Sequence, residues 1–368
     1  MLFFFYFFSV FFVFLIVVFI FDFLFIFSIF FINFFWKDLL MLFVFIFFMV
    51  NLLDDLRAKA KLNPRRIVFP EGSDLRILRA ARILKDEGIA HPVILDGALA
   101  ESLLRENNIS LDGLELVNDV SFDDYVSLLL SKRKHKGLSR EEAEVLVRDF
   151  NYLGVLMVES GFVDAMISGA THPTASVLRP ALQIIKTREG VKTASSFFIV
   201  FKGDVSYFFS DCAFVINPSA VELCDIAIST ARSAKSFGFE PRVALLSFST
   251  KGSAEHEVLF KLREALSLIK GVDSDLVVDG ELQLDSAIVP GVASLKCPTS
   301  IIQGDANVLI FPDLNSGNIA YKLVERLGGF KAVGPIIQGL NKPVNDLSRG
   351  CSVEDIVNVA ILTVLEVD

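Results

Sequence analysis

The sequence from about residue 50 onward predicts an α/β fold built on a largely parallel β-sheet. Short apolar runs bounded by Gly, Ser or Pro alternate with stretches of helical period, and strands that are buried on both faces of a parallel sheet have this pattern. This part spans roughly 320 residues, which is enough for two domains.

The first strand is expected at residues 66–70 (RIVFP), where a short apolar run ends at a proline. The segment after it has apolar residues at helical spacing and predicts a helix. Its apolar face carries Leu75, Leu78, Ile83 and Leu84. Further strands are expected at 92–95, 165–167, 242–248 and 307–311, and a last helix at 353–365.

The first fifty residues have a different composition. They are almost entirely Phe, Leu, Ile and Val, and their only charged residues are Asp22, Lys37 and Asp38. Residues 1–21 are apolar enough to span a bilayer, so a membrane anchor is one interpretation. A cleaved signal peptide fits less well, because no charged start precedes the run and no small-residue cleavage pattern follows it.

The same segment lacks Ala, Gly and Pro, although transmembrane helices use Gly and Ala where they pack together. Phe, Leu, Ile, Asn and Lys are the residues that T- and A-rich DNA encodes in any reading frame. We therefore expect residues 1–48 to be a translated non-coding stretch, with Met49 as the natural start.

The charge and the cysteines exclude several classes of function. The net charge is −9, which argues against general affinity for nucleic acid. The four cysteines are scattered without a C-x-x-C pair, so neither a zinc site nor a disulfide framework is predicted. Free thiols suit a reducing compartment, and the cytoplasm is the expected location.

Ligands of open α/β sheets bind beyond the carboxyl ends of the strands, where loops lead into helix N-termini. The first such loop contains Ser168 and Thr171, and Arg179 lies on the helix that follows. We expect an anion to bind there. A turn with a helix cap explains the same residues.

Two further loops have similar chemistry. The loop after the strand at 242–248 contains Lys251, which can pair with a phosphate although the G-x-x-x-x-G-K-[ST] spacing is absent. The loop after the strand at 307–311 contains Asn315 and Ser316. Turn formation explains both loops equally well.

A fourth loop brings a hydroxyl, a guanidinium and a carboxylate close together in the sequence. Arg349 can bind a phosphate with two hydrogen bonds, Ser348 can donate to a developing oxyanion, and Asp355 can accept a proton. In the alternative interpretation, Ser352 and Asp355 form a capping box that serves only the helix. Cys351 is expected to pack in the core, because no histidine near it in the sequence would activate its thiol.

Taken together and in this order, eight segments resemble the phosphate acetyltransferase family, which belongs to a wider group that includes phosphate butyryltransferases. The similarity runs from about residue 51 to the C-terminus. The segments are RIVFPEGSDLRILRAARIL, ISGATHPTASVLRPALQII, GVKTASSFF, SDCAFVINPSA, PRVALLSFSTKGS, DGELQLDSAIVP, ANVLIFPDLNSGNIAYK and NKPVNDLSRGCSVEDIV.

The resemblance implies reversible transfer of an acetyl group between acetyl-CoA and inorganic phosphate in one ternary complex, with no metal ligand and no cofactor beyond CoA as a substrate. It makes Asp355 the base that deprotonates the CoA thiol, Ser348 the donor to the oxyanion and Arg349 the phosphate ligand. Arg179 and Arg133 match two further family arginines that bind substrate. The basic segment around Arg133 is also compatible with an ordinary solvated surface.

The resemblance also implies two α/β domains like those of the isocitrate and isopropylmalate dehydrogenases, as three-layer αβα sandwiches with the active site in the interdomain cleft. The first domain is expected to comprise residues 50–189 and 337–368, with residues 190–336 inserted as the second. Homodimers are usual for the family. Three alternatives stay open: another acyl-chain specificity such as butyryl, a non-catalytic CoA-binding module, and a membrane protein defined by its apolar start.

Overall fold

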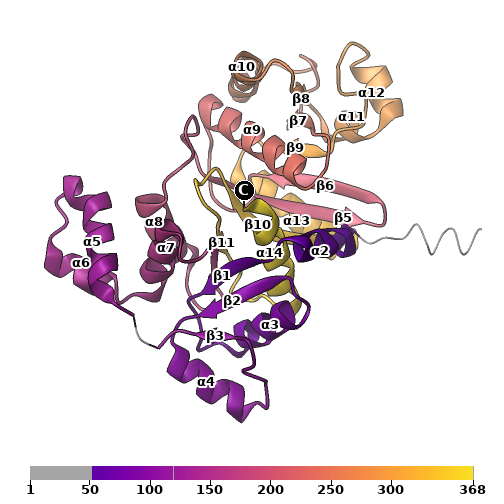
Figure 1. Ribbon diagram of the computed structural model, residues 1–368. Helices are drawn as coiled ribbons and strands as arrows, with labels where there is room; N and C mark the ends of the chain where they lie inside the picture. The colour runs from indigo at the N-terminus through magenta and orange to yellow at the C-terminus, as the bar shows by residue number, and fades with distance from the viewer. Residues whose placement is uncertain (1–51, 119, 368) are drawn as a thin grey trace, which may run out of the picture. The chain divides into compact units, whose positions relative to one another are not determined.

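Two β-sheets organise the described part of the protein, residues 52–118 and 120–367 of a computed structural model (Figure 1). The first sheet has the strand order β11-β4-β1-β2-β3, and the second has the order β10-β5-β6-β9-β7-β8. The strands of the first sheet are β1 (Arg65–Phe69), β2 (Ala90–Ile94), β3 (Glu115–Leu116), β4 (Ala165–Ser168) and β11 (Val344–Asp346). Those of the second are β5 (Ser195–Lys202), β6 (Val205–Ser210), β7 (Arg242–Leu246), β8 (Val277–Leu282), β9 (Val308–Ile310) and β10 (Lys331–Gln338).

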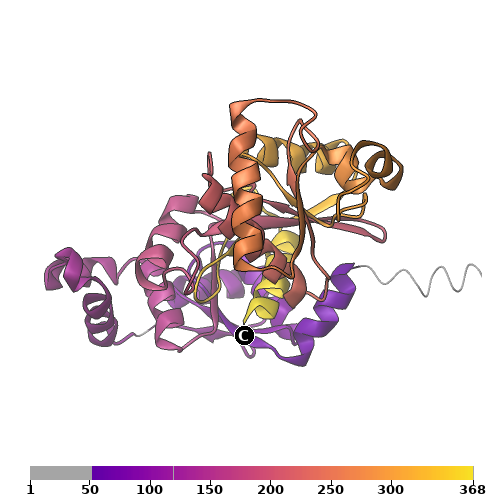
Figure 2. The same ribbon diagram turned by 90° about the horizontal axis from the view of Figure 1, so that it is seen from above.

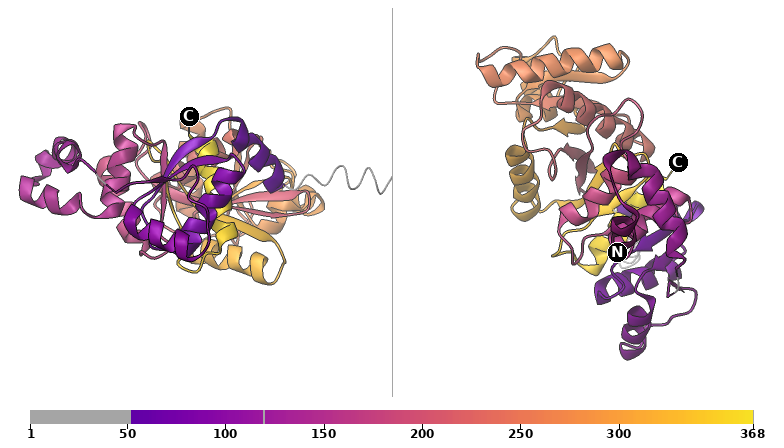
Figure 3. Two further views of the ribbon diagram at one scale, coloured as in Figure 1. Left: turned by 60° about the horizontal axis from the view of Figure 1, so that its bottom comes forward. Right: turned by 90° about the vertical axis from the view of Figure 1, so that its left-hand side faces the viewer.

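The helices surround these sheets and connect their strands. They are α2 (Leu52–Leu62), α3 (Leu75–Asp86), α4 (Gly97–Glu106), α5 (Phe122–Arg133), α6 (Arg140–Leu146), α7 (Phe150–Ser160), α8 (Thr174–Ile184), α9 (Ala220–Ser236), α10 (Glu257–Val272), α11 (Leu284–Ile288), α12 (Pro290–Lys296), α13 (Leu314–Arg326), α14 (Val353–Glu366) and the short 3-10 helix η1 (Lys134–Lys136). α10 packs on α9 (Figure 2). α5 and α6 pack on one another, outside α7 and α8 (Figure 3).

The first sheet is parallel throughout, as the alternation of strands and helices predicted. The strands expected at 66–70, 92–95 and 165–167 correspond to β1, β2 and β4. Parallel strands end at the same edge of a sheet. The loops that follow β1, β4 and β11 therefore meet at one edge, where the first and fourth candidate loops lie.

The second sheet is mixed, so the predicted parallel arrangement holds for only part of it. β7, β8 and β9 are parallel to their neighbours, whereas β5 runs antiparallel to both β6 and β10. Only Gly203 and Asp204 separate β5 from β6, and Gly203 has a φ of +57°. A two-residue connection makes a hairpin and is too short for a parallel crossover.

Helix α14 is part of a core that both sheets share. One cluster of buried apolar side chains contains Ile67 of β1, Phe208 of β6 and Ile356 of α14. α14 packs on α2 and α3 and also on β10, and it lies between the two sheets in Figure 1. The predicted helix at 353–365 is confirmed, and the burial of residues 356–364 on all sides explains why this stretch is mostly apolar.

Residues 1–48 lie outside the described residues. Their interpretation as a translated non-coding stretch, an anchor or a signal peptide therefore stays a prediction. Within residues 52–118 and 120–367, no helix combines the length and apolar character needed to cross a membrane. The domain boundaries at 189/190 and 336/337 stay a prediction.

Candidate active site

The loop after β4 is folded around the carboxylate of Glu71, which follows β1. The N–H groups of Gly169 and Ala170 donate to Glu71 Oε2 at 2.9 and 2.8 Å. Those of Thr171 and His172 donate to Oε1 at 2.8 and 3.1 Å. We predicted that an anion binds at this loop, and the carboxylate of Glu71 already occupies these N–H groups.

Ser168 and Thr171 make their hydrogen bonds within the protein. Ser168 is fully buried, and its hydroxyl donates to Asn151 Oδ1 at 2.7 Å. The Thr171 hydroxyl donates to Glu71 Oε1 at 2.7 Å. Both hydroxyls therefore bind side chains of other elements, and neither caps the following helix, since the N-cap of α8 is Pro173 without a side-chain hydrogen bond. A substrate contact by either residue stays a prediction.

Two buried carboxyl groups at this edge have opposite pKa shifts. Burial tends to raise the pKa of Glu71, but the hydrogen bonds from Thr171, His172 and the loop N–H groups lower it below its ordinary value. Among the described residues, Asp346 at the end of β11 accepts a side-chain hydrogen bond only from the hydroxyl of Thr174, at 2.6 Å. Burial raises the pKa of Asp346 to about 6, and the negative charge of Glu71 adds to this effect.

The second oxygen of Asp346 is buried without a partner among the described residues. The backbone of Gly169 passes directly over it, and a Cβ at that position would lie 2.3 Å from Oδ1. Gly169 also has a φ of +110°, so only glycine suits this position. Burying a carboxyl oxygen without a hydrogen bond favours the protonated form.

The loop after β11 carries Ser348 and Arg349, Asp355 lies in the first turn of α14, and all three are exposed. Ser352 and Asp355 form the predicted capping box: the Ser352 N–H and hydroxyl both donate to Asp355 Oδ2 at 2.8 Å. The Asp355 N–H donates to the Ser352 hydroxyl at 3.1 Å. Asp355 Oδ1 accepts no hydrogen bond from a described residue. The cap therefore orients the carboxylate and still leaves one oxygen for a substrate.

Arg76 connects this loop to the loop after β4, and the sequence analysis missed it. Its guanidinium pairs with Asp74 Oδ2 at 2.7 Å, and Asp74 caps the N-terminus of α3. Nη1 donates to the carbonyl oxygens of Arg349 and Cys351 at 2.9 and 3.0 Å. Nη2 donates to the carbonyl oxygen of Ala170 at 2.9 Å. The only sequence signal is an Asp-x-Arg at the start of the helix that follows the first strand.

Cys351 lies in the core, as expected, with 7% of its surface exposed. Burial raises the pKa of its thiol to about 11, although the positive charge of Arg76 opposes this. A thiol in this environment stays protonated near neutral pH and is a poor nucleophile.

The structure brings Arg133 and Arg179 into one neighbourhood. Arg133 ends α5, Arg179 lies on α8, and these two helices pack on each other. The charges of both arginines act on the hydroxyl of Tyr152, whose pKa burial raises and the two arginines partly lower. That hydroxyl donates to Gln183 Oε1 of α8 at 3.0 Å.

The guanidinium groups of Arg133, Arg179 and Arg349 share one property. None of them has a hydrogen bond or an ion pair with another described residue. By contrast, Arg76 is paired with Asp74 and Arg263 with Glu281. Unpaired guanidinium groups remain available to an anionic ligand.

In the second sheet, Lys251 is engaged by the protein itself. Its Nζ donates to Asp279 Oδ1 at 2.8 Å, and Asp279 is buried. The carboxylate of Glu281 accepts from the Gly252 N–H at 2.8 Å and from the Arg263 guanidinium. As at Glu71, a protein carboxylate occupies the donors of a predicted phosphate loop, so Lys251 is not free to bind phosphate in this arrangement.

Asn315 and Ser316 lie in the first turn of α13. Ser316 takes part in the N-terminal cap of this helix. Its N–H donates to Asp313 Oδ1 at 2.9 Å, and its hydroxyl donates to the Asp313 carbonyl at 2.8 Å. Asn315 is exposed. No hydrogen bond or ion pair between described residues joins Lys251, Asn315 or Ser316 to the loop that carries Ser348.

The described residues contain no group of three or more His, Cys, Asp or Glu side chains placed to hold a metal ion. What the carboxyl edge of the first sheet presents is the hydroxyl of Ser348, a carboxylate oxygen of Asp355 and the unpaired guanidinium group of Arg349. These features define a class, the α/β enzymes whose polar groups act on an anionic substrate.

Comparison with known proteins narrows this class. The family model described as "Phosphate acetyl/butaryl transferase" matches residues 51–364. The chain is 45% identical over 319 residues to the phosphate acetyltransferase of Bacillus subtilis, covering 86% of this chain and 98% of that protein. It is 46% identical over 325 residues to the phosphate acetyltransferase of Staphylococcus aureus, again covering 86% and 98%.

A solved structure agrees with these relatives. The chain superposes on a phosphotransacetylase from Streptococcus pyogenes with a TM-score of 0.82 and 45% identity, covering 86% of this chain and 98% of that one. The protein belongs to the phosphate acetyl/butyryl transferase family, a family of acyltransferases. The resemblance stated from the sequence is confirmed.

Proposed function

We propose that this protein catalyses the reversible transfer of an acetyl group between acetyl-CoA and inorganic phosphate. The observation that carries the proposal is the set of three unpaired guanidinium groups, those of Arg133, Arg179 and Arg349, in a chain that otherwise pairs many of its cations. Both substrates are anions, and local rather than net charge determines whether a site attracts them.

The phosphate is bound by side chains rather than by backbone N–H groups. Glu71 and Glu281 occupy the N–H donors of the loops after β4 and β7. Arg349 therefore provides the main phosphate contact, with Arg179 and Arg133 as further ligands. A guanidinium can make two parallel hydrogen bonds to a phosphate, which fixes its orientation as well as its position.

The chemical step follows from the loop after β11 and the first turn of α14. Asp355 Oδ1 accepts the proton of the CoA thiol, and the thiolate attacks the carbonyl carbon of acetyl phosphate. The Ser348 hydroxyl donates to the oxyanion of the tetrahedral intermediate. The bond between the carbonyl carbon and the phosphate oxygen then breaks, and phosphate leaves with the electron pair while Arg349 holds it. The reverse reaction runs through the same groups.

The remaining expectations belong to the same proposal. The two sheets correspond to two α/β domains like those of the isocitrate and isopropylmalate dehydrogenases, with residues 190–336 inserted and the substrates bound in the interdomain cleft. The enzyme is a cytoplasmic homodimer that needs no metal and no cofactor beyond CoA as a substrate. The family resemblance supports each of these points.

A thiol-release assay tests the proposal. Purified full-length protein is given acetyl-CoA and phosphate, free CoA is followed with a thiol reagent, and acetyl phosphate is measured separately. Equal amounts of the two products are expected, and acetyl-, propionyl- and butyryl-CoA are compared to set the acyl specificity. Arg349→Gln is expected to lower kcat/KM about 10²-fold or more, whereas Arg326→Gln on the exposed surface of α13 leaves it unchanged. Normal turnover in Arg349→Gln, or no acetyl phosphate from the unmodified protein, contradicts the proposal.

A further inference from the structure

His172 lies in the loop after β4, at the edge of the sheet where the candidate active site is, and the chemical step derived above gives it no part. It directly precedes Pro173, the N-cap of α8. Its side chain is 45% exposed, its Nδ1 contacts Glu71, and its Nε2 makes no hydrogen bond with another described residue. The ring of His256, by contrast, accepts the N–H of Val258 in the cap of α10. The protein therefore holds one ring nitrogen of His172 and leaves the other available.

Glu71 determines which ring nitrogen of His172 carries the proton. Nδ1 lies 2.7 Å from Glu71 Oε1. Backbone N–H groups of residues 169–172 donate to both oxygens of Glu71. Burial tends to raise the pKa of Glu71, but its hydrogen bonds lower it. Glu71 is therefore a carboxylate, and Nδ1 must be the donor in this contact. In the neutral ring the lone pair is then on Nε2, where a ligand can exchange a proton with it.

The loop that contains His172 lies beside the loop that carries Arg349, the main phosphate ligand of the proposed reaction. The strands that precede these loops, β4 and β11, are parallel neighbours in the first sheet. One guanidinium, that of Arg76, donates to the carbonyl oxygens of both Ala170 and Arg349, each at 2.9 Å. Ala170 and Arg349 are therefore held close together, and His172 is the second residue after Ala170. The imidazole is on the same edge of the sheet as a phosphate bound by Arg349.

The proposed acetyl transfer needs a proton for the phosphate that leaves. Acetyl phosphate is a dianion near neutral pH, so the phosphate departs as a trianion, a poor leaving group, unless its departing oxygen is protonated. Asp355 accepts the thiol proton in the same step and does not supply this one. Arg349 stays charged, since a guanidinium does not lose its proton in a protein. Glu71 and Asp346, the carboxyl groups packed against the loop after β4, are buried beneath its backbone.

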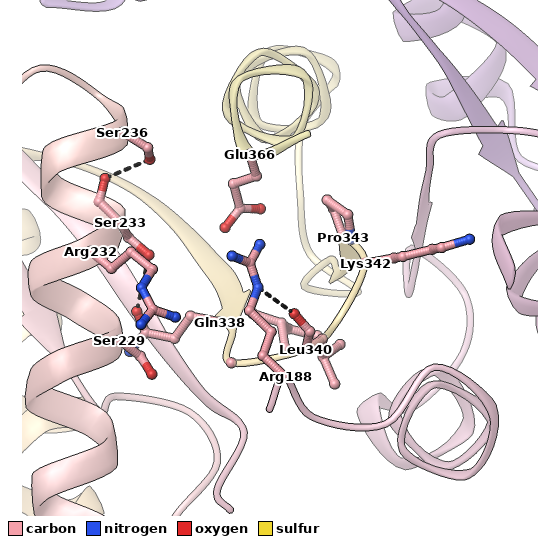
Figure 4. Close-up of a pocket in the computed structure, with 12 residues that line it drawn as sticks. Arg188, Ser229, Arg232, Ser233, Ser236, Gln338, Leu340, Lys342, Pro343 and Glu366 are labelled. Carbon is pink, nitrogen blue, oxygen red and sulfur yellow. Dashed lines mark hydrogen bonds between the residues drawn. The ribbon is translucent and has the colours of Figure 1, made fainter. Parts of the chain in front are cut away.

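Glu366 is another carboxyl group that holds a proton near neutral pH, because burial raises its pKa to about 8. It lines a pocket between α9, the connection from β10 to β11 and the C-terminal end of α14 (Figure 4). Asp355 and Glu366 lie at opposite ends of α14, about 16 Å apart at the rise of an α-helix. Glu366 is therefore too far from Arg349 to protonate a phosphate there, whereas His172 is on the correct edge of the sheet.

We propose that His172 is a catalytic acid and base for the phosphate group, with Glu71 as its positioning residue. In acetyl-CoA formation, the thiolate bonds to the carbonyl carbon and the bond from that carbon to the phosphate oxygen breaks. The departing oxygen keeps the electron pair and takes the proton of His172 Nε2. Asp355 is then protonated and His172 neutral, and exchange with water restores both, so the thiol proton is balanced by the one on phosphate. In the reverse direction, neutral Nε2 removes the proton of the attacking phosphate. This role rests on the proposed acetyl transfer.

Two amide substitutions in the full-length protein distinguish proton transfer from hydrogen bonding. The amide nitrogen of His172→Asn can take the place of Nδ1 and keep the contact with Glu71, whereas the amide of His172→Gln can take the place of Nε2. Neither amide transfers a proton. Both variants are therefore expected to lower kcat about 10²-fold or more, with little change in the KM for acetyl phosphate, because Arg349 still binds it.

His91→Asn is the matched control, since His91 is exposed on β2, and it is expected to leave kcat unchanged. Urea unfolding verifies that each variant is folded. Normal kcat in His172→Asn means that the ring only holds the loop. Normal kcat in His172→Gln means that the ring only donates or accepts a hydrogen bond. Either result overturns the inference.

Nuclear magnetic resonance tests the contact independently of turnover. The protein has four histidines, and isotope-labelled histidine makes their ring nitrogens visible. The Nε2 resonance of His172 is identified by its absence from His172→Asn. Inorganic phosphate is expected to shift this resonance, and sodium chloride at the same ionic strength is not. An equal response to both salts overturns the inference even if the enzyme is active. If phosphate shifts the resonance but the unmodified protein makes no acetyl phosphate, the proposed acetyl transfer is wrong and the contact of His172 with phosphate stands.

Discussion

At the scale of single residues, the candidate active site is determined by which carboxylates already accept hydrogen bonds from the protein on both oxygens and which do not. Glu71 and Glu281 accept several hydrogen bonds each and fill positions that resemble anion sites in the sequence. Asp346 accepts one hydrogen bond and has a buried oxygen without a partner. Asp355 has one oxygen in a helix cap and one available. Only the last arrangement suits a group that exchanges a proton with a substrate.

Asp346 is expected to make stability depend on pH. Its pKa is about 6 in the folded protein and 3.8 as the reference value, so the folded state binds the proton more tightly. The contribution of Asp346 to the free energy of unfolding is fully present below about pH 4 and is lost as pH rises through about 6. The difference of about two pKa units corresponds to about 3 kcal/mol. Asp346→Asn removes this pH dependence and makes the protein more stable relative to wild type at pH 7.5 than at pH 4.

Urea unfolding at the two pH values measures this effect. Asp204→Asn, at the exposed turn between β5 and β6, is the control and is expected to have little effect at either pH. An unchanged pH dependence in Asp346→Asn means that Asp346 titrates near its ordinary pKa in the folded protein.

Arg76 is expected to act as a positioning residue. Arg76→Gln removes the hydrogen bonds that tie Ala170, Arg349 and Cys351 together, so the loop with Ser348 shifts and kcat falls about 10²-fold. Arg82→Gln is a matched control on the same helix, because Arg82 also pairs with a carboxylate and donates to two carbonyl oxygens, those of Ser110 and Asp112. Steady-state kinetics and urea unfolding of both variants separate positioning from stability. Equal losses of activity in the two variants rule out the positioning effect.

At the scale of elements, the N-terminus of α14 combines two tasks that the sequence presented as alternatives. Ser352 and Asp355 complete a capping box, and the same box holds Asp355 with one oxygen free. α9 begins with an equivalent box made by Ser219 and Glu222, and no hydrogen bond between described residues joins this box to the loop that carries Ser348. The comparison between these two caps separates helix stability from catalysis.

Ser352→Ala and Ser219→Ala are both expected to destabilise the protein by about 1 kcal/mol, because each removes a helix cap. Only Ser352→Ala lowers kcat as well, since Asp355 Oδ2 loses the hydroxyl that orients it. Unfolding free energies from urea titration and kcat from the thiol assay are measured on both variants. A catalytic loss in Ser219→Ala, or none in Ser352→Ala, contradicts this account.

At the scale of the whole molecule, the two sheets share one core around α14. Buried apolar side chains of β1, β6, β7, α9 and α14 belong to one cluster. The backbone N–H of Ile337 also donates to Asn345 Oδ1 at 2.7 Å, which ties β10 to β11. Residues 52–367 are therefore expected to unfold as one cooperative unit.

Ile356→Ala, in the middle of this core, tests the cooperativity. It is expected to destabilise the protein by about 2–5 kcal/mol through the cavity it leaves. Hydrogen exchange follows amides of β4 in the first sheet and β9 in the second, and both are expected to lose the same protection. Leu295→Ala, with an 82% exposed side chain, is the control. Loss of protection in only one sheet shows that the sheets unfold separately.

The local sequence was sufficient to predict those strands and helices whose residue pattern repeats over a few neighbouring positions. The parallel strands β1, β2 and β4, the helix α14 and its cap are all predictable, because apolar periodicity and a Ser-x-x-Asp motif act over a few residues. The grouping of Ser348, Arg349 and Asp355 is likewise visible in eight consecutive residues. These parts of the candidate site needed no tertiary information.

The tertiary structure alone decided which donors are already occupied. Glu71 binds the N–H of Gly169, which is 98 residues away, and Arg76 binds the carbonyl of Arg349, which is 273 residues away. Such contacts arise when parallel strands place their carboxyl ends at one edge, and no local pattern records them. For this reason the sequence alone predicted anion-binding chemistry, and only the folded chain showed that arginine side chains, rather than loop N–H groups, remain available for it.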